Sequence, residues 1–419
     1  MIANQDAIQK VLKNNILALG AEAKKEKQKD PEVINATIGM LMDEKGKLYV
    51  FDSVNEARKE LSNEEQFAYS NISGTPVFKS AIEKWIFGSY LEDIQKEYYT
   101  SVIPTPGGSG ALSLIFENYV ERGQKVLLPK QMWENYLIYA NDIGFKAEYY
   151  QLFDGEKFAF ERLKKQVLEL KKEQDKIAIL LNDPCQNPTG FCMDDNDYDN
   201  LVSLVNENKD VKFVIIMDVA YFDFYNSNPD IIRARYAKLS KMNDNAIIFF
   251  CFSGSKSFGL YGLRIGALLA LTRSEEENQV FFDSACYSCR SRWSSATTYG
   301  ISLISKLILD DKLSLMFKKE VEKVCLMLER RSNIFLNAAK EMELNIYPYQ
   351  KGFFICVPYK DPELLMKELY KDKVRSIPTK EALRIAICAI NEDEAKRLPR
   401  IIQERIKKLN EEGTLWNQI

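Results

Sequence analysis

Short apolar runs alternate with amphipathic stretches through the middle of this chain. An unbroken apolar run of about four to eight residues is typical of a buried strand, and apolar residues at every third or fourth position indicate a helix. Because the runs lack polar alternation, they predict a mainly parallel sheet with helices on both faces. The predicted strands are residues 33–38, 125–128, 146–151, 177–181, 211–217 and 247–252, and the predicted helices are residues 54–61, 77–90, 133–143, 160–172 and 195–208.

Both ends of the chain depart from this alternation. Residues 5–29 predict a helical arm rich in Lys and Glu, which ends at Asp30-Pro31 because the residue before a proline avoids the helical conformation. Residues 299–343 predict one long helix that links two domains, and a small α/β layer follows it. We therefore expect an N-terminal arm with part of a small domain (1–50), a large α/β domain (51–300), and an interdomain helix with the rest of the small domain (301–419).

Polar loops follow several predicted strands, and open parallel sheets bind ligands beyond the carboxyl ends of their strands. Asp218 comes directly after the apolar run 211–217, where a carboxylate is costly unless a cation or a donor meets it. A protonated ring nitrogen would meet that need. The loop 182–190 is rich in Asn, Pro, Thr and Gly, and an ordinary structural turn explains it equally well.

The most informative loop runs from Ser253 to Gly266 and contains small hydroxyl residues, Lys256 and Arg264. Hydroxyl groups and a guanidinium can bind a phosphate. A desolvated lysine beside other cations can form a Schiff base with an aldehyde. The loop therefore suits a phosphorylated carbonyl ligand, and the alternative is a strand end with a solvated lysine.

A glycine-rich loop at residues 103–110 leads directly into a predicted helix at residues 111–116. Backbone N–H groups at a helix start attract anions. The loop is neither a Walker A loop nor a GxGxxG motif, so an ordinary helix start is equally compatible with it.

The composition narrows the class of protein. The chain has 419 residues, 46% of them apolar, and a formal net charge of −3, which allows a large core and more than one domain. It has no basic stripe of the kind that nucleic-acid binding needs. Polar and charged residues occur within the first ten positions, and no apolar run reaches the roughly 18 residues of a membrane span. We expect a soluble, cytoplasmic protein without nucleic-acid or membrane partners.

The sequence contains no histidine. This excludes Ser/His/Asp and Cys/His triads, HExxH metal sites and any imidazole base. Proton transfer must then fall to Lys, Tyr, Cys, a carboxylate or a cofactor. Most of the eight cysteines lie in apolar runs, as small buried hydrophobic residues do. Cys286 and Cys289 form a single CxxC, to which we assign no redox chemistry, and we expect no metal site.

Taken in order, the polar loops resemble those of the fold type I pyridoxal-phosphate aminotransferases of class I and II, and most closely the aspartate aminotransferase branch. The resemblance runs from about Val33 to the C-terminus. It implies an α/β fold with a large domain, whose mainly parallel sheet is sandwiched by helices, and a smaller α/β domain. It also implies the cofactor pyridoxal 5'-phosphate. The motifs that carry it are Asn187-Pro188-Thr189-Gly190, Asp218-Val219-Ala220-Tyr221, and Ser253-Gly254-Ser255-Lys256-Ser257-Phe258-Gly259-Leu260-Tyr261 with Arg264 and Gly266.

The resemblance implies a role for each polar loop. Lys256 would bind the cofactor aldehyde and, once released by the incoming amino acid, move the proton from the α-carbon. Asp218 would pair with the pyridine nitrogen and keep it protonated. Asn187 and Tyr221 would hydrogen-bond the ring hydroxyl oxygen.

The resemblance also assigns the remaining cofactor contacts. Trp133 would stack on the ring, with an ordinary core tryptophan as the alternative. Tyr69 would reach the phosphate of a neighbouring subunit, which predicts a homodimer with shared active sites. The phosphate itself would be bound by Gly108, Ser109, Ser253, Ser255 and Arg264.

The substrate contacts are a third group. Arg384, in a predicted strand at residues 382–389, corresponds to the arginine that binds the α-carboxylate of the substrate in a bidentate pair. An arginine on the exposed face of the strand is the alternative. Gly39 matches the glycine that closes over substrate. Arg290 aligns with the arginine that binds the side-chain carboxylate across the dimer, and Arg292 competes for that role.

The chain departs from the aspartate branch at Tyr136, which stands where that branch usually has a histidine behind the ring-nitrogen carboxylate. A hydroxyl there can still orient Asp218, but it changes the local proton network. The Schiff base does not depend on this position.

Three functions remain open from the sequence. The first is an aminotransferase of amino acid metabolism acting on aspartate or glutamate, with an aromatic amino acid as the alternative substrate. The second is another fold type I reaction, such as β-elimination or decarboxylation, although an arginine on the α-carboxylate argues against decarboxylation. The third is a non-catalytic regulatory protein that has kept the fold.

Overall fold

The computed structural model describes residues 2–3, 7–8, 10–11 and 16–416. These residues form two compact units. Unit 2 consists of Leu48–Glu329 and Pro348–Phe353, and unit 1 consists of the described residues of Met1–Lys47, Arg330–Tyr347 and Phe354–Ile419. The chain passes from unit 2 to unit 1 between Glu329 and Arg330 rather than near residue 300.

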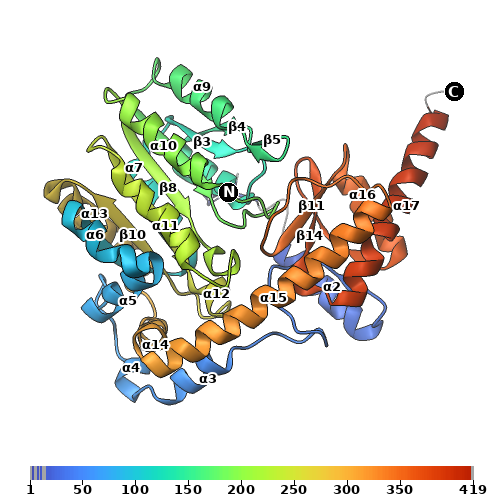
Figure 1. The fold of residues 1–419 in the computed structure, drawn as a ribbon, viewed down its shortest axis with the longest axis horizontal. Coiled ribbons are helices and arrows are strands. Elements are labelled where there is room, and N and C mark those ends of the chain that lie inside the picture. Colours follow the sequence, from blue (N-terminus) through green and yellow to red (C-terminus); the bar gives the residue numbers. More distant parts are fainter. Residues whose placement is uncertain (1, 4–6, 9, 12–15, 417–419) are drawn as a thin grey trace. The chain divides into compact units, whose positions relative to one another are not determined.

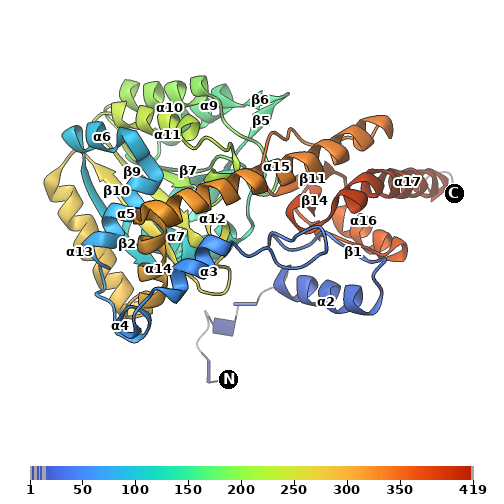
Figure 2. The same cartoon turned by 60° about the horizontal axis from the view of Figure 1, so that its bottom comes forward.

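Unit 2 is built on a seven-stranded sheet in the order β2-β10-β9-β8-β7-β3-β4. The strands from β9 to β4 pair in parallel, and β10 is antiparallel to both of its neighbours. The mainly parallel sheet is therefore confirmed. Helices cover both faces: Figure 2 shows α9, α10 and α11 above the sheet and α7 and α13 below it. The strands are β2 (Tyr99–Thr105), β3 (Lys125–Pro129), β4 (Lys146–Tyr150), β7 (Lys176–Asn182), β8 (Lys212–Asp218), β9 (Ala246–Ser253) and β10 (Gly266–Thr272), with a hairpin of β5 (Phe153–Asp154) and β6 (Lys157–Phe158).

The central strands are apolar throughout because both faces of the sheet are covered. All eight residues of β9 are buried, as are six of the seven in β8. The sequence did not predict two strands of this sheet. The run in β10 is mostly Ala and Leu, which are strong helix formers, and β2 contains Pro104, which a strand tolerates at a sheet edge.

The helices of unit 2 differ from the predicted ones in several places. The single helix expected at 299–343 is two helices, because the Asp310 carboxylate accepts a hydrogen bond from the Leu313 N–H at 3.0 Å and starts a new helix there. The helix expected at 133–143 is one short α-helix followed by a wider π turn, Ala140–Gly144. The helices α4, α6, α11, α12 and α13 were not predicted. The helices are α3 (Asp52–Lys59), α4 (Asn63–Phe67), α5 (Pro76–Phe87), α6 (Leu91–Glu97), α7 (Gly107–Tyr119), α8 (Asn135–Tyr139), α9 (Phe160–Leu170), α10 (Asp195–Glu207), α11 (Asp230–Lys238), α12 (Gly254–Ser257), α13 (Glu275–Arg292), α14 (Thr298–Leu309) and α15 (Asp311–Glu341), whose last residues belong to unit 1 (Figure 1).

Unit 1 contains a three-stranded antiparallel sheet in the order β11-β14-β13 and a parallel pair of β1 with β12. The helix α16 packs on β13 and β14. Of the arm predicted at 5–29, the described helix is α2, and residues 5, 6, 9 and 12–15 lie outside the described residues. The elements are α2 (Ile16–Lys29), β1 (Ile34–Asn35), β11 (Phe354–Pro358), α16 (Pro362–Leu369), β12 (Val374–Arg375), β13 (Ile377–Pro378), β14 (Ala382–Ala386) and α17 (Glu392–Trp416).

Within the described part of the chain, no helix combines the length and the apolar character needed to cross a bilayer.

Candidate active site

The predicted polar loops of unit 2 meet at one edge of its sheet. The strands β7, β8 and β9 are parallel and in register, so that Asn182, Asp218 and Cys251 lie side by side at their carboxyl ends. The loops that follow these strands carry the Asn187, Tyr221 and Lys256 motifs. This edge is where a parallel sheet binds its ligands.

Asp218 is the last residue of β8 and is 6% exposed. The Tyr136 hydroxyl donates to its Oδ2 at 2.7 Å, and the Ala220 N–H donates to its Oδ1 at 3.2 Å. Burial raises the pKa of Asp218 to about 6, although both hydrogen bonds act to lower it. Because both donors are neutral, a cation that reached this carboxylate would relieve the cost of its burial. The protonated nitrogen of a pyridine ring fits that requirement.

Two aromatic side chains, Trp133 and Tyr136, form a pair beside Asp218. Trp133 is half-buried and meets the Tyr136 ring edge-on, with 5.6 Å between centroids and an interplanar angle of 86°.

Asn187 is buried, and its main-chain N–H donates to the Asn182 Oδ1 at 2.8 Å. Asn182 in turn donates through Nδ2 to the main-chain oxygen of Asp218 at 2.8 Å. The Asn187 loop and the Asp218 strand are thus fixed to each other through one buried amide.

Lys256 lies in the short helix α12 and is half-buried. Its Nζ is 5.9 Å from the centroid of the Tyr221 ring and 4.9 Å from that of the Tyr261 ring. Two aromatic faces therefore border the amine and limit the directions in which it can move. The sequence predicted Tyr221 as a site residue but gave Tyr261 no role, although it belongs to the same motif.

The predicted phosphate contacts converge at the start of α7. Arg264 has a left-handed backbone (φ 55°), and its Nη1 donates to the Ser255 Oγ at 2.8 Å. A Cβ at Gly107 would lie 2.9 Å from the Arg264 Nη2, and one at Gly108 would lie 3.5 Å from the Ser253 Cβ. Pro106, which precedes α7, provides no side-chain cap. The first N–H groups of the helix and a guanidinium thus border one position, which suits a phosphate.

Two glycines to which the sequence assigned no role, Gly107 and Gly266, make this approach possible. A Cβ at Gly266 would lie 2.6 Å from the main-chain carbon of Gly107 and 2.4 Å from the main-chain oxygen of Phe252. Gly107 itself has φ 71°, which favours glycine. The two backbones touch, so the lysine loop and the start of α7 come together only because neither position has a side chain.

Three predicted residues of unit 2 are exposed rather than gathered at this edge. Tyr69 is 98% exposed. Arg290 is exposed at the end of α13 and donates to the Ser294 Oγ at 2.6 Å. Arg292 donates to the Ser113 Oγ at 2.9 Å and forms an ion pair with Glu117.

Gly39 and Arg384 belong to unit 1. Arg384 is 5% exposed in β14, so the alternative of an exposed-face arginine is wrong. Its Nη2 donates to the Thr37 main-chain oxygen at 2.9 Å, and its guanidinium carbon lies 4.4 Å from the centroid of the Phe354 ring. Arg384 is thus buried and fixed within unit 1, and Gly39 follows Thr37 by two residues.

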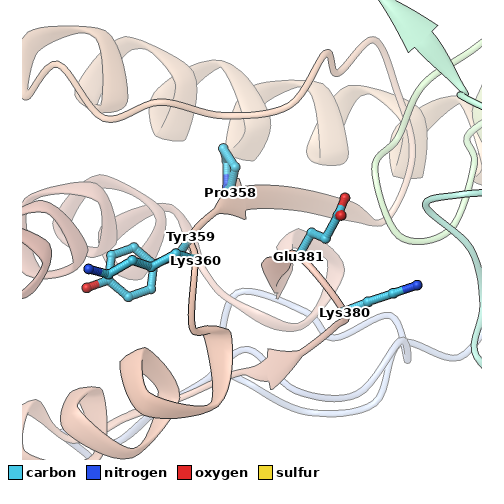
Figure 3. Close-up of a pocket in the computed structure, with 5 residues that line it drawn as sticks. All are labelled: Pro358, Tyr359, Lys360, Lys380 and Glu381. Carbon is cyan, nitrogen blue, oxygen red and sulfur yellow. The ribbon is translucent and has the colours of Figure 1, made fainter.

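Unit 1 also has a surface hollow, with a volume of about 440 Å³ (Figure 3). It contains none of the predicted site residues and lies where β11 ends and β14 begins. We assign it no role in the chemistry. Its lining residues are Pro358, Tyr359, Lys360, Lys380 and Glu381.

Comparison with known proteins gives consistent matches. The sequence profile of the family described as aminotransferase class I and II matches residues 31–402. A cytoplasmic aspartate aminotransferase of Dictyostelium discoideum is 25% identical over 298 residues, which cover 70% of this chain and just under two thirds (66%) of that protein. A tyrosine aminotransferase of Rhizobium meliloti is 25% identical over 367 residues, covering 86% of this chain and 90% of that protein. The crystal structure of an aminotransferase from Anaerococcus prevotii has a TM-score of 0.91 at 28% identity, covering 96% of this chain and 98% of that one.

Proposed function

The chain belongs to the aminotransferase class I and II family, and we propose that it transfers the amino group of an L-amino acid to a 2-oxo acid with pyridoxal 5'-phosphate as its cofactor. The observation that carries the proposal is the meeting of three groups at one sheet edge. These are a buried carboxylate with only neutral donors, a lysine between two tyrosine rings, and an uncapped helix start beside an arginine. Each group suits a different part of the same molecule.

When bound, the cofactor supplies an electron-poor ring that accepts the electron pair of the substrate α-carbon. Asp218 pairs with the ring nitrogen and keeps a proton on it. Trp133 stacks on the ring face, and Asn187 and Tyr221 donate to the ring hydroxyl oxygen. The support for these roles is the burial of Asp218 and the amide link between its strand and the Asn187 loop.

Lys256 would hold the cofactor aldehyde through Nζ. Once freed by the incoming amino acid, Nζ would be the base that takes up the proton of the substrate α-carbon. The Tyr221 and Tyr261 rings border the amine and limit its movement. With no histidine in the chain, Lys256 is the base that the geometry favours.

Arg264, Ser253 and Ser255 bind the phosphate together with Gly108 and Ser109 at the start of α7. Arginine suits this role because its planar fork can make two hydrogen bonds to one phosphate. The left-handed backbone of Arg264 aims its guanidinium at Gly107, where a side chain would obstruct it.

The protein acts as a homodimer in the cytoplasm, and each active site includes residues of both subunits. The exposure of Tyr69 supports this proposal, because a tyrosine that contacts so little of its own chain is available to the phosphate site of a partner. The neighbouring Phe67 is 78% exposed. Such apolar side chains are commonly covered at an interface.

The preferred substrates are aspartate and glutamate. Arg384 binds the α-carboxylate and Gly39 closes over the substrate, while Arg290 of the other subunit binds the side-chain carboxylate. Arg290 is favoured over Arg292 because Arg292 is already paired with Glu117. An aromatic amino acid is the second candidate, which the similarity to a tyrosine aminotransferase supports.

A panel of amino donors tests the substrate. Each amino acid is added to the cofactor-loaded protein, and conversion of the cofactor to its amino form is followed by absorbance. We expect aspartate and glutamate to react with the wild-type protein. In Arg290→Ala the reaction with these two amino acids should fall about a hundredfold, while any reaction with phenylalanine should be retained. Arg292→Ala is the matched control. If it loses aspartate while Arg290→Ala does not, the assignment of Arg290 is wrong.

A further inference from the structure

Tyr136 links two of the side chains that would contact the cofactor ring. It is fully buried, and its hydroxyl donates to the Asp218 Oδ2 at 2.7 Å. The edge of its ring packs against Trp133. One side chain therefore contacts both the buried carboxylate and the Trp133 ring.

The short helix α8 continues this arrangement toward the phosphate. Tyr139 lies one turn after Tyr136, and its hydroxyl donates to the main-chain oxygen of Ser109 at 3.0 Å. The chain then widens into the π turn Ala140–Gly144, a feature that is frequent at functional sites. A single helical turn thus reaches both Asp218 and the first turn of α7.

Resting on the proposed function, we propose that Tyr136 is a positioning residue for the ring end of the cofactor: its hydroxyl holds Asp218 in line with the ring nitrogen, and its ring holds Trp133 against the ring face. Tyr139 holds the phosphate end separately. The two tyrosines of α8 therefore govern different parts of one ligand.

A tyrosine performs this task differently from a histidine. The titratable groups that face the Tyr136 hydroxyl are Asp218, Cys251 and Tyr221, and burial followed by these neighbours raises the Tyr136 pKa well above 10. The hydroxyl therefore keeps its proton and stays a neutral donor to Asp218. An imidazole with an unperturbed pKa near 6.5 would change charge across the neutral range. In this chain the carboxylate is oriented by a donor of constant charge.

The test compares two ligands that differ only at the ring nitrogen. Pyridoxamine phosphate and its 1-deaza analogue both lack an aldehyde, so their affinities do not depend on a bond to Lys256. The ratio of their dissociation constants, measured by calorimetry on the cofactor-free full-length protein, reports how strongly the site uses the nitrogen. We expect wild type to prefer pyridoxamine phosphate and Tyr136→Phe to lower that preference about tenfold, because the carboxylate loses a buried hydrogen bond.

Three variants separate positioning from a general loss of structure. Tyr139→Phe should weaken both ligands by the same factor and keep the ratio. Tyr150→Phe removes another fully buried hydroxyl, which donates to the Leu180 main-chain oxygen at 2.9 Å, and should leave both affinities within about twofold of wild type. Tyr136→His supplies a donor again and should keep the ratio within about threefold of wild type.

Each outcome decides between two claims. If wild type binds neither ligand, the proposed cofactor is wrong. If wild type prefers pyridoxamine phosphate over the 1-deaza analogue and Tyr136→Phe preserves the ratio of the two dissociation constants, Tyr136 is not a positioning residue. Should Tyr136→Phe fail to fold, Tyr136→His decides instead: a preserved ratio supports the proposal, and a lost ratio despite the donor overturns it.

Discussion

Replacing Asp218 by asparagine should stabilise the cofactor-free protein at alkaline pH. Asp218 is buried with neutral donors, and burial raises its pKa from 3.8 to about 6. Because the folded-state pKa lies above the unfolded value, the fold favours the protonated carboxyl. The favourable contribution of the Asp218 carboxyl to the free energy of unfolding is complete below about pH 4 and is lost as the pH rises through about 6.

The size of the effect follows from the difference between the two pKa values. A difference of about two pH units corresponds to about 3 kcal/mol between the protonated and ionised states. Asparagine has nearly the same shape and stays neutral, and its carbonyl oxygen can still accept from Tyr136. At pH 8 Asp218→Asn should therefore raise the free energy of unfolding by up to about 3 kcal/mol, and below about pH 4 it should raise it by well under about 1 kcal/mol.

Cofactor binding should reverse the sign of the stability change that Asp218→Asn causes. With pyridoxal phosphate bound, Asp218 gains a cationic partner that asparagine cannot replace, so wild type should gain more stability from the cofactor than the variant does. Urea unfolding at pH 4 and pH 8, with and without cofactor, measures the free energy of unfolding of each protein under all four conditions. Asp183→Asn is the matched control, since burial also raises the pKa of Asp183 to about 6 and neutral donors also hold it. It should keep the full gain from the cofactor.

Two results would refute this reasoning. Asp218→Asn could be less stable than wild type at pH 8 without cofactor, which would mean that the ionised carboxylate stabilises the fold. It could also show the same gain at pH 4 and pH 8, which would separate the effect from ionisation. In either case, the buried and ionised carboxylate of Asp218 would not be what destabilises the cofactor-free fold.

Further predictions concern the glycine contact, the phosphate and the dimer. Gly266→Ala should lower the free energy of unfolding by at least about 2 kcal/mol, because its Cβ would lie 2.4 Å from a carbonyl oxygen of β9; Gly262→Ala, with nothing within 4 Å of the new Cβ, should change it by less than about 0.5 kcal/mol in urea unfolding. Arg264→Ala should reduce the preference for pyridoxamine phosphate over pyridoxamine by about tenfold or more in calorimetry, and an unchanged preference would exclude Arg264 from the phosphate site. Mixing inactive Lys256→Ala and Arg290→Ala subunits should restore aspartate transamination to about a quarter of the wild-type rate if sites are shared across a dimer, and no recovery in subunits shown to have exchanged would contradict shared sites.

The sequence predicted the parts of the site that depend on strand ends. A continuous apolar run identifies a buried parallel strand, and the polar residue after it must lie at the ligand edge. That rule located Asp218 after β8 and Lys256 after β9, and the register of the two strands confirms that their ends adjoin. The Tyr136 contact with Asp218 was predicted from the resemblance, and the structure confirms the hydrogen bond.

Other features depend on contacts between distant parts of the chain, which no local pattern encodes. The strand β10 resembles a helix because its Ala and Leu residues have high helix propensity, and only pairing with β9 and β2 makes it a strand. The contact of Gly107 with Gly266 is equally long-range. All five residues of β14 are buried, so the burial of Arg384 depends on parts of the chain that cover both faces of the strand, which its own sequence does not encode.

The most direct test of the central claim is the absorbance spectrum of purified Lys256→Ala beside that of wild type. Wild type loaded with pyridoxal phosphate should show the visible band of cofactor bound through a lysine, and aspartate or another amino donor should convert it to the band of the amino form. Lys256→Ala should lack the visible band of the lysine-bound form and lose transamination by at least about a thousandfold. A wild-type protein without the band, or a variant that still transfers amino groups at the wild-type rate, would contradict the assignment of Lys256 and the function built on it.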